Sequence, residues 1–253
     1  MAPEDQTAPS QSERPPISLR AQVRHIIDLA LATPPGRFIS NLSLRDVTLA
    51  ALALGALSGL GLYAAYDPRD GARSIAEWLL TRPELILVRN LHYWSMHLFV
   101  VSSGVFLWRY LSATVTPPID RAVRLGLVLS VPIIVFLMAS GFLLRSDADA
   151  RNFLPLAFEI VTHLPFVGPL LASSLFGRVE NQSDLLFHHA FTAAICVALV
   201  FLATLRRPAP RPATLALVGG AVFILSLFLS PGLNDGLDRR TSGPWLFLGA
   251  QEL

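Results

Sequence analysis

Long apolar runs, separated by short polar segments that contain arginine, dominate the pattern of this chain. A helix needs about 20 mostly apolar residues to cross a bilayer. Five runs reach or approach that length, at residues 47–66, 91–110, 122–144, 185–205 and 213–229. The last run is the shortest, but it contains no charged residue. The pattern therefore predicts an all-α integral membrane protein, a helical bundle with five transmembrane helices.

A weaker, amphipathic pattern precedes the first run. Apolar residues recur at helical spacing opposite Arg20 and Arg24, at Leu19, Val23, Ile26, Ile27 and Ala30. This pattern predicts a helix that lies on the membrane surface. Residues 1–16, rich in Pro, Ser, Gln and Glu, predict a disordered tail.

Composition narrows the class of protein. The chain is 53% hydrophobic and 15% charged, whereas a soluble domain carries about 25% charged residues. The net charge is only +2, and no basic patch suggests nucleic acid as a partner. The single cysteine, Cys196, excludes an internal disulfide and a multi-cysteine metal site. An ordinary cytosolic enzyme and a disordered regulator are also excluded.

The distribution of arginine predicts an orientation, because positive residues favour the cytoplasmic side. Residues 1–46, the loops after the second and fourth runs and the adjoining ends of the second and third runs carry 11 arginines and six acidic residues. The opposite side carries nine arginines and 12 acidic residues. We therefore expect a protein of a bacterial-type inner membrane. Its N-terminus would be cytoplasmic, and its C-terminus would lie on the outer, periplasmic side.

Four of the six histidines lie inside the apolar runs, where polar side chains are costly and mark functional sites. His92 begins the second run, and His188 and His189 begin the fourth, so all three lie at the same depth near the outer side. Imidazoles from two helices at one depth are what a bis-histidine haem site requires.

Helix geometry restricts which histidines share a face. His188 and His189 point about 100° apart, so only one of them faces the bundle centre, and the sequence leaves the choice open. His97 lies about 140° around the helix from His92 and is expected to pack or to support a neighbour. His25 and His163 lie outside the runs, and we expect them to be solvated.

Several short motifs occur in a recognisable order. They are Ser58-Gly59 before Tyr66-Asp67-Pro68, Arg89-Asn90-Leu91-His92-Tyr93-Trp94-Ser95, Gly141-Phe142-Leu143-Leu144, Pro165-Phe166-Val167-Gly168 and Gly243-Pro244-Trp245-Leu246-Phe247-Leu248. In order and spacing they resemble the N-terminal, haem-binding half of cytochrome b of bc-type and bf-type quinol-oxidising complexes. The resemblance covers about residues 17–205 and continues more weakly to the end.

The resemblance implies a four-helix haem-binding core in residues 47–205. Residues 17–46 would form the interfacial helix and its linker, and residues 206–253 a fifth transmembrane helix with an outer tail. It also implies iron ligation by His92 and either His188 or His189. Gly59 and Gly141 would allow the haem to approach the backbone. Apart from the resemblance, the charge and depth of Arg89 suggest that it pairs with a propionate.

The family carries two haems, with ligands on one helix about 14 residues apart, roughly 21 Å of helix rise. At that spacing from His92 this chain has Phe106, and from His188 or His189 it has Leu202 or Ala203. We therefore expect a single haem b, on the outer side.

The quinol-oxidation motifs also depart from the family. Arg145-Ser146-Asp147 stands where the family has Pro-Trp-Gly, and Pro244 precedes Trp245 without the family's glutamate. Bifurcated quinol oxidation is therefore in doubt, and we assign no catalytic residue. An outer quinone pocket would be walled by residues 153–164 with Trp245 and Phe247. The family's remaining spans are expected from another subunit.

These observations predict an electron-transfer subunit of a quinone-linked respiratory or photosynthetic-type oxidoreductase complex. Its partners would be other membrane subunits, a membrane quinone and an outer redox protein of the cytochrome c or iron–sulfur type. The alternative is a haem-free structural subunit that keeps the cytochrome b fold. A transporter is disfavoured, because the first, third and fifth runs offer only small or hydroxylated polar residues in the middle of the membrane.

Overall fold

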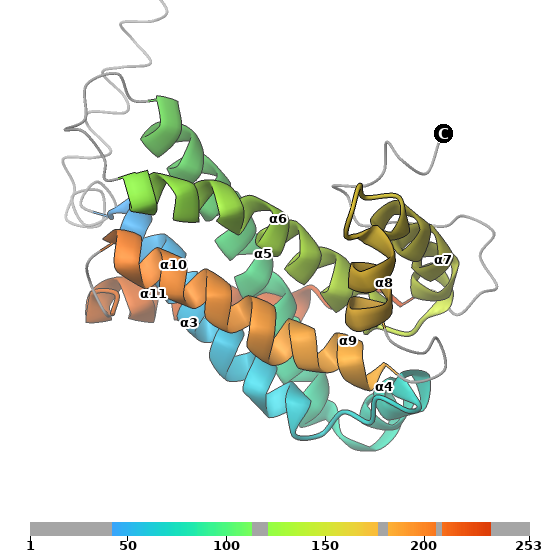
Figure 1. The fold of residues 1–253 in the computed structure, drawn as a ribbon. Helices are drawn as coiled ribbons and strands as arrows, with labels where there is room; N and C mark the ends of the chain where they lie inside the picture. Colours follow the sequence, from blue (N-terminus) through green and yellow to red (C-terminus); the bar gives the residue numbers. More distant parts are fainter. Residues whose placement is uncertain (1–41, 113–120, 177–181, 206–208, 234–253) are drawn as a thin grey trace, which may run out of the picture. The chain divides into compact units, whose positions relative to one another are not determined.

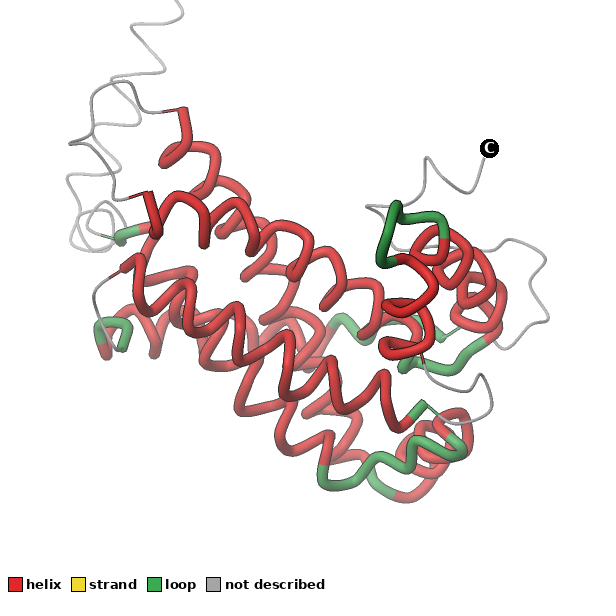
Figure 2. The backbone as a smooth tube through the Cα atoms, in the orientation of Figure 1, coloured by secondary structure: helices red, strands yellow, loops and turns green. Residues whose placement is uncertain are grey.

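The computed structural model describes residues 42–112, 121–176, 182–205 and 209–233. These residues form helices and contain no strand (Figures 1 and 2). By its internal contacts the chain divides into Met1–Leu42 and Ser43–Leu253, and all the helices below belong to the second unit. The prediction of an all-α fold is confirmed for the described residues. The predicted N-terminal tail and most of the predicted surface helix and its linker lie outside them.

Each of the five apolar runs lies largely within helical structure, although the first run continues three residues beyond the end of its helix at Tyr63. The helices are α3 (Leu44–Tyr63), α5 (Pro83–Ser112), α6 (Arg121–Leu143), the continuous segment α9 (Ser183–Phe187), η1 (His188–Ala193) and α10 (Ala194–Leu205), and finally α11 (Pro212–Phe228). Three stretches are long and apolar enough to cross a membrane: Leu44–Tyr63, Arg124–Leu143 and Ser183–Ala203. They indicate a membrane protein.

Helix α5 extends well beyond its apolar run. It begins at Pro83, eight residues before the run at Leu91. Proline is favoured in the first turn of a helix, and Glu84 places a negative charge near the positive end of the helix dipole. His92 therefore lies in the third turn of α5 and not at its end.

Three shorter helices fill the connections: α4 (Gly71–Thr81), α7 (Ala148–Thr162) and α8 (Gly168–Phe176). Helices α4 and α7 start at aspartate caps, because Asp70 accepts from the backbone N–H of Arg73 and Asp147 from that of Ala150. Helix α7 contains most of the apolar segment 153–164, and α4 falls in a connection for which the hydrophobic pattern predicted no helix.

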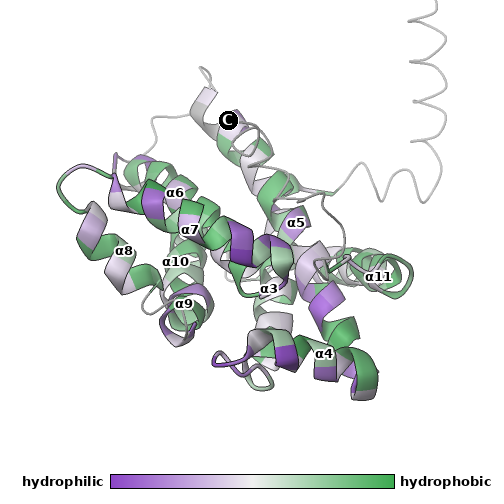
Figure 3. Cartoon of the chain, turned by 90° about the vertical axis from the view of Figure 1, so that its right-hand side faces the viewer, coloured by the Kyte–Doolittle hydropathy of each residue, from purple (hydrophilic) through white to green (hydrophobic). Residues whose placement is uncertain are grey.

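The long helices pack side by side. Helix α3 packs along α5, and α6 packs along α10, while η1 contacts both α3 and α6 (Figure 1). Helix α11 contacts α3 and α5. Figure 3 colours α11 as hydrophobic along its length, whereas α4 carries hydrophilic segments. This difference agrees with α4 joining two long helices and α11 being an apolar helix.

Candidate functional site

Two histidines from different helices face each other in the structure. The ring centroids of His92, on α5, and His189, in η1, lie 6.2 Å apart with an angle of 68° between the ring planes. Both side chains are half-buried. Of the two candidates that the sequence left open, the structure brings His189 to His92.

The hydrogen bond of His92 determines which ring nitrogen carries its proton. Nδ1 of His92 lies 2.9 Å from the carbonyl oxygen of Gly55 on α3. A carbonyl oxygen only accepts, so Nδ1 is the donor in this bond. In the neutral ring Nε2 then keeps its lone pair, as in a histidine that ligates a metal.

The same reasoning applies to His189. Its Nδ1 lies 2.8 Å from Oγ of Ser140, whose hydroxyl donates to the carbonyl oxygen of Phe136 at 2.6 Å. Because the Ser140 hydroxyl donates its only proton to the Phe136 carbonyl, its oxygen accepts the hydrogen bond from Nδ1 of His189. The bonds to Gly55 and Ser140 both use Nδ1, which leaves Nε2 of each ring out of these two bonds.

Two glycines make room for the two rings. A Cβ atom at Gly59 would lie 3.0 Å from Cε1 of His92, and one at Gly141 would lie 3.1 Å from Cε1 of His189. Contacts this short do not occur without a shift in a packed interior. Each imidazole thus lies directly against the backbone of a neighbouring helix.

The described histidines other than this pair are engaged elsewhere. His188, on the exposed side of η1, lies 3.1 Å from Oγ1 of Thr192. His97 donates through Nδ1 to the carbonyl oxygen of Tyr93 at 2.8 Å and lies against the Tyr93 ring. His163 is exposed and makes the equivalent bond to Glu159. His25 lies outside the described residues.

Two arginines lie at the same end of the helices, and we call this region, with His92 and His189, the histidine end. Nη1 of Arg89 lies 3.3 Å from the carbonyl oxygen of Pro231, and Nη2 of Arg145 lies 3.3 Å from that of Gly232. Arg145 also forms an ion pair with Asp147. The sequence pointed to Arg89 but not to Arg145, because only folding brings residue 145 and residues 231–232 together.

Aromatic side chains occupy the other part of the same helices. The ring of Phe201 lies 5.4 Å from that of Phe99 and 6.2 Å from that of Phe106. Phe99 and Phe201 are fully buried. We call these three residues the phenylalanine layer. Phe106 is the position at which the spacing of the cytochrome b family would place a second ligand on α5.

A polar junction adjoins the histidine end. The Tyr66 hydroxyl lies 2.8 Å from the carbonyl oxygen of Leu144 and 3.0 Å from Oε1 of Gln182, and Oγ of Ser146 donates to the same Oε1 at 3.0 Å. A Cβ atom at Gly71 would lie only 2.5 Å from Oγ of Ser146, so glycine is required there. Burial raises the pKa of Tyr66 above its ordinary value.

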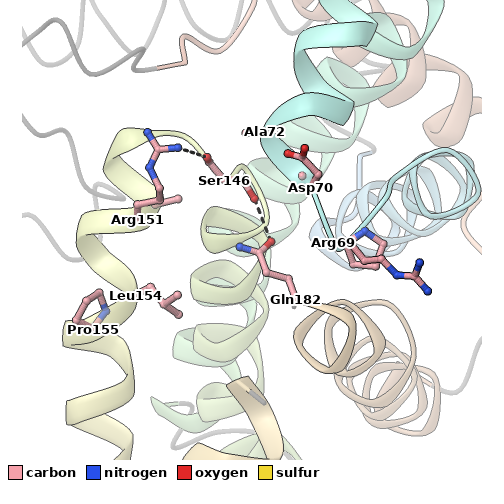
Figure 4. A pocket seen from close by; sticks show the side chains of 11 residues that line it. Arg69, Asp70, Ala72, Ser146, Arg151, Leu154, Pro155 and Gln182 are labelled. Carbon is pink, nitrogen blue, oxygen red and sulfur yellow. Dashed lines mark hydrogen bonds between the residues drawn. The ribbon is translucent and has the colours of Figure 1, made fainter. Parts of the chain in front are cut away.

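The junction forms one wall of a cleft of about 350 Å³ (Figure 4). Helix α7 contributes Arg151, Leu154 and Pro155, and residues 68–72 line the opposite side. Because Oε1 of Gln182 accepts from Ser146, its amide nitrogen is directed away from that bond, toward the cleft (Figure 4). Of the predicted quinone pocket, part of the 153–164 segment lines this cleft, whereas Trp245 and Phe247 lie outside the described residues.

In the part of the chain that the structure describes, no three or more His, Cys, Asp or Glu side chains gather as a metal-binding group. The histidine pair is thus a two-ligand arrangement. The chain matches no protein-family model, and a search of curated proteins finds no match.

Proposed function

We propose that this chain is a membrane-embedded electron-transfer subunit that holds one haem b between His92 and His189. The observation that carries the proposal is the separation of the two rings. A metal–imidazole bond is about 2 Å long, so two imidazoles on opposite sides of one ion have their ligating nitrogens about 4 Å apart. Each ring centroid lies further out than its nitrogen, and the observed centroid separation of 6.2 Å is compatible with such a pair.

Two protein ligands favour a porphyrin over a bare ion. A structural zinc site takes four protein ligands, whereas the described residues offer the two histidines and no larger group. A porphyrin brings four nitrogens of its own, so that two imidazoles complete the coordination of its iron. The hydrogen bonds of both Nδ1 atoms would hold the rings in the ligating tautomer.

Bis-imidazole ligation defines the chemistry. A haem held by two imidazoles would supply one-electron transfer. The chain's own residues would bind and orient the group: His92 and His189 would ligate its iron, with Gly59 and Gly141 supporting the rings. Arg89 would provide a cation for a propionate.

The phenylalanine layer favours one haem over two. On α5, Phe106 stands where the family would have its second ligand, and its ring lies 6.2 Å from that of the fully buried Phe201. We propose a four-helix core made of α3, α5, α6 and α9–η1–α10, with α11 as a fifth transmembrane helix. The arginine bias supports a cytoplasmic N-terminus and an outer histidine end.

A quinone and protein partners complete the proposed function. The cleft beside the polar junction combines the Gln182 amide and Arg151 with the apolar Leu154 and Pro155, a combination suited to a quinone head group. An outer redox protein would exchange electrons with the haem. Other membrane subunits would cover the exposed apolar face of α11, which includes Ile224 and Phe228.

A haem-free structural subunit is the second candidate. The phenylalanine layer shows that this bundle packs tightly without a cofactor at one level, and the histidine pair is itself half-buried and hydrogen-bonded. Arg145-Ser146-Asp147 also replaces the family's quinol-site motif. This candidate expects no haem in the native complex.

The test is the amount of haem per chain. The full-length protein is purified in detergent, within its native complex where possible, and measured by pyridine haemochrome and dithionite-reduced minus oxidised spectra. We expect one low-spin haem b. Two haems would refute the role of the phenylalanine layer, and none would leave the structural subunit as the function.

A further inference from the structure

Two guanidinium groups converge at the histidine end from separate segments. Arg89 extends from α5 and Arg145 follows the end of α6, yet they hydrogen-bond to the carbonyl oxygens of two consecutive residues, Pro231 and Gly232. The segment after α11 thus holds the two cations beside each other.

Their charges are only partly compensated. Arg89 is 9% exposed, and the side chain of Arg145 is 20% exposed. Arg145 forms an ion pair with Asp147, and the same carboxylate also attracts Arg89, which has no ion pair of its own among the described residues. One anion thus faces two cations. Nε of Arg145 is buried without a hydrogen-bond partner. Burying cations without matching anions is costly, so this arrangement favours an anionic ligand.

The two arginines flank the histidine pair. Arg89 precedes His92 by three residues, slightly less than one helical turn. Arg145 follows Gly141 by four residues, and Gly141 is the backbone on which the His189 ring rests. One arginine therefore lies on the helix that carries His92, and the other shortly follows the helix that supports His189.

We propose that Arg145 joins Arg89 in a dicationic site that binds the two carboxylates of an acidic porphyrin. This inference rests on the proposed haem. The forked guanidinium pairs with a carboxylate through two hydrogen bonds, and Nε of Arg145 is a buried donor that has no hydrogen-bond partner among the described residues. Arg145 stands where the cytochrome b family has proline, so the second cation is a property of this chain. Asp147 and the 231–232 carbonyls are the positioning groups.

The experiment compares two porphyrins on the full-length chain, purified in detergent from haem-depleted cells. One is iron protoporphyrin IX, and the other is its dimethyl ester, in which both carboxylates are capped. We expect the unmodified protein to bind the free acid at least about ten-fold more tightly, the equivalent of one charge-assisted pair. In Arg145→Gln this preference falls about ten-fold, while the affinity for the ester is unchanged.

Arg82→Gln is the matched control, because Arg82 is an exposed arginine shortly before Arg89 that pairs with Glu84. It should keep the full preference. Equal loss of affinity for both porphyrins in Arg145→Gln would show a structural role and overturn the inference.

The unmodified protein provides a second test that does not depend on the folding of a variant. If it binds both porphyrins equally, the dicationic site is refuted, while the proposed haem stands. If it binds neither porphyrin, the proposed function itself fails and this inference fails with it.

Discussion

The two ends of the same helices have opposite interiors. At the histidine end, α5 and η1 present His92 and His189, half-buried and with Nε2 outside the bonds to Gly55 and Ser140. Further along, α5 and α10 present the phenylalanine layer, where Phe99 and Phe201 are fully buried and in edge-to-face contact. The apolar runs that build both ends are alike. A few inward-facing residues therefore decide whether a bundle interior is filled by side chains or is equipped to bind a group.

The difference extends to the backbone around each end. Gly59 and Gly141 lie directly under the two imidazoles. At the other end, a Cβ atom at Gly126 would make only an ordinary contact, 3.7 Å from Cγ1 of Val200. The two imidazoles therefore need glycine beside them, whereas Gly126 has room for a side-chain carbon.

Replacing either histidine of the pair should have the largest effect, because it would remove the property that distinguishes the histidine end from the phenylalanine layer. His92→Leu or His189→Leu would remove one of the two proposed haem ligands, and we expect haem to be absent from the purified protein by pyridine haemochrome. His188→Leu is the matched control, since His188 contacts Thr192 on the exposed side. Full haem in His189→Leu, together with loss in His188→Leu, would reverse the ligand assignment.

A substitution in the phenylalanine layer should lower the free energy of unfolding and leave the haem content unchanged. Phe201→Ala leaves a cavity at a fully buried position, and we expect a loss of about 3–5 kcal/mol in the free energy of unfolding. Denaturation in detergent measures the loss. The adjacent Leu202→Ala, at a position that is 36% exposed, should cost much less. Loss of haem from folded Phe201→Ala would contradict the conclusion that the phenylalanine layer contributes packing and that haem binding depends on the histidine end.

Substitution of glycine by alanine adds a single carbon atom and so tests the close approach of the imidazoles to the backbone. Gly59→Ala and Gly141→Ala each introduce a Cβ about 3 Å from an imidazole carbon, and overpacking of this kind costs about 1–3 kcal/mol. We expect lower thermal stability and weaker haem retention. Gly104→Ala has no neighbouring atom within 4 Å and should instead gain up to about 1 kcal/mol from helix propensity.

The smallest expected effect concerns the polar junction beside the histidine end. Tyr66→Phe removes a hydroxyl that lies near Leu144 and Gln182, which should cost about 1–2 kcal/mol. Because burial raises the pKa of Tyr66 in the folded state, the unfolded chain loses this proton first as the pH rises. The stabilisation is therefore complete below pH about 10 and is lost above it. Melting curves between pH 8 and pH 11, roughly centred on that value, should fall more steeply for the unmodified protein than for Tyr66→Phe.

The amino-acid sequence by itself determined the helical class and the location of the long helices. Hydrophobic runs are local, so they could be located without knowledge of the fold, and the described residues confirm the all-α prediction. The sequence also singled out His92, His188 and His189 as polar residues inside apolar runs. It could not locate the start of α5, because the first turns of that helix lie outside the apolar run.

Only the tertiary structure decided how the candidate site is assembled. The π-helical turn His188–Ala193 changes the rotation between successive side chains, so regular helix geometry does not apply where His189 meets His92. The contact of Arg145 with Gly232 joins residues far apart in the chain. The phenylalanine layer joins α5 with α10 in the same way. Such pairings depend on how helices pack, a long-range property, whereas the hydrophobic pattern records only which residues avoid water.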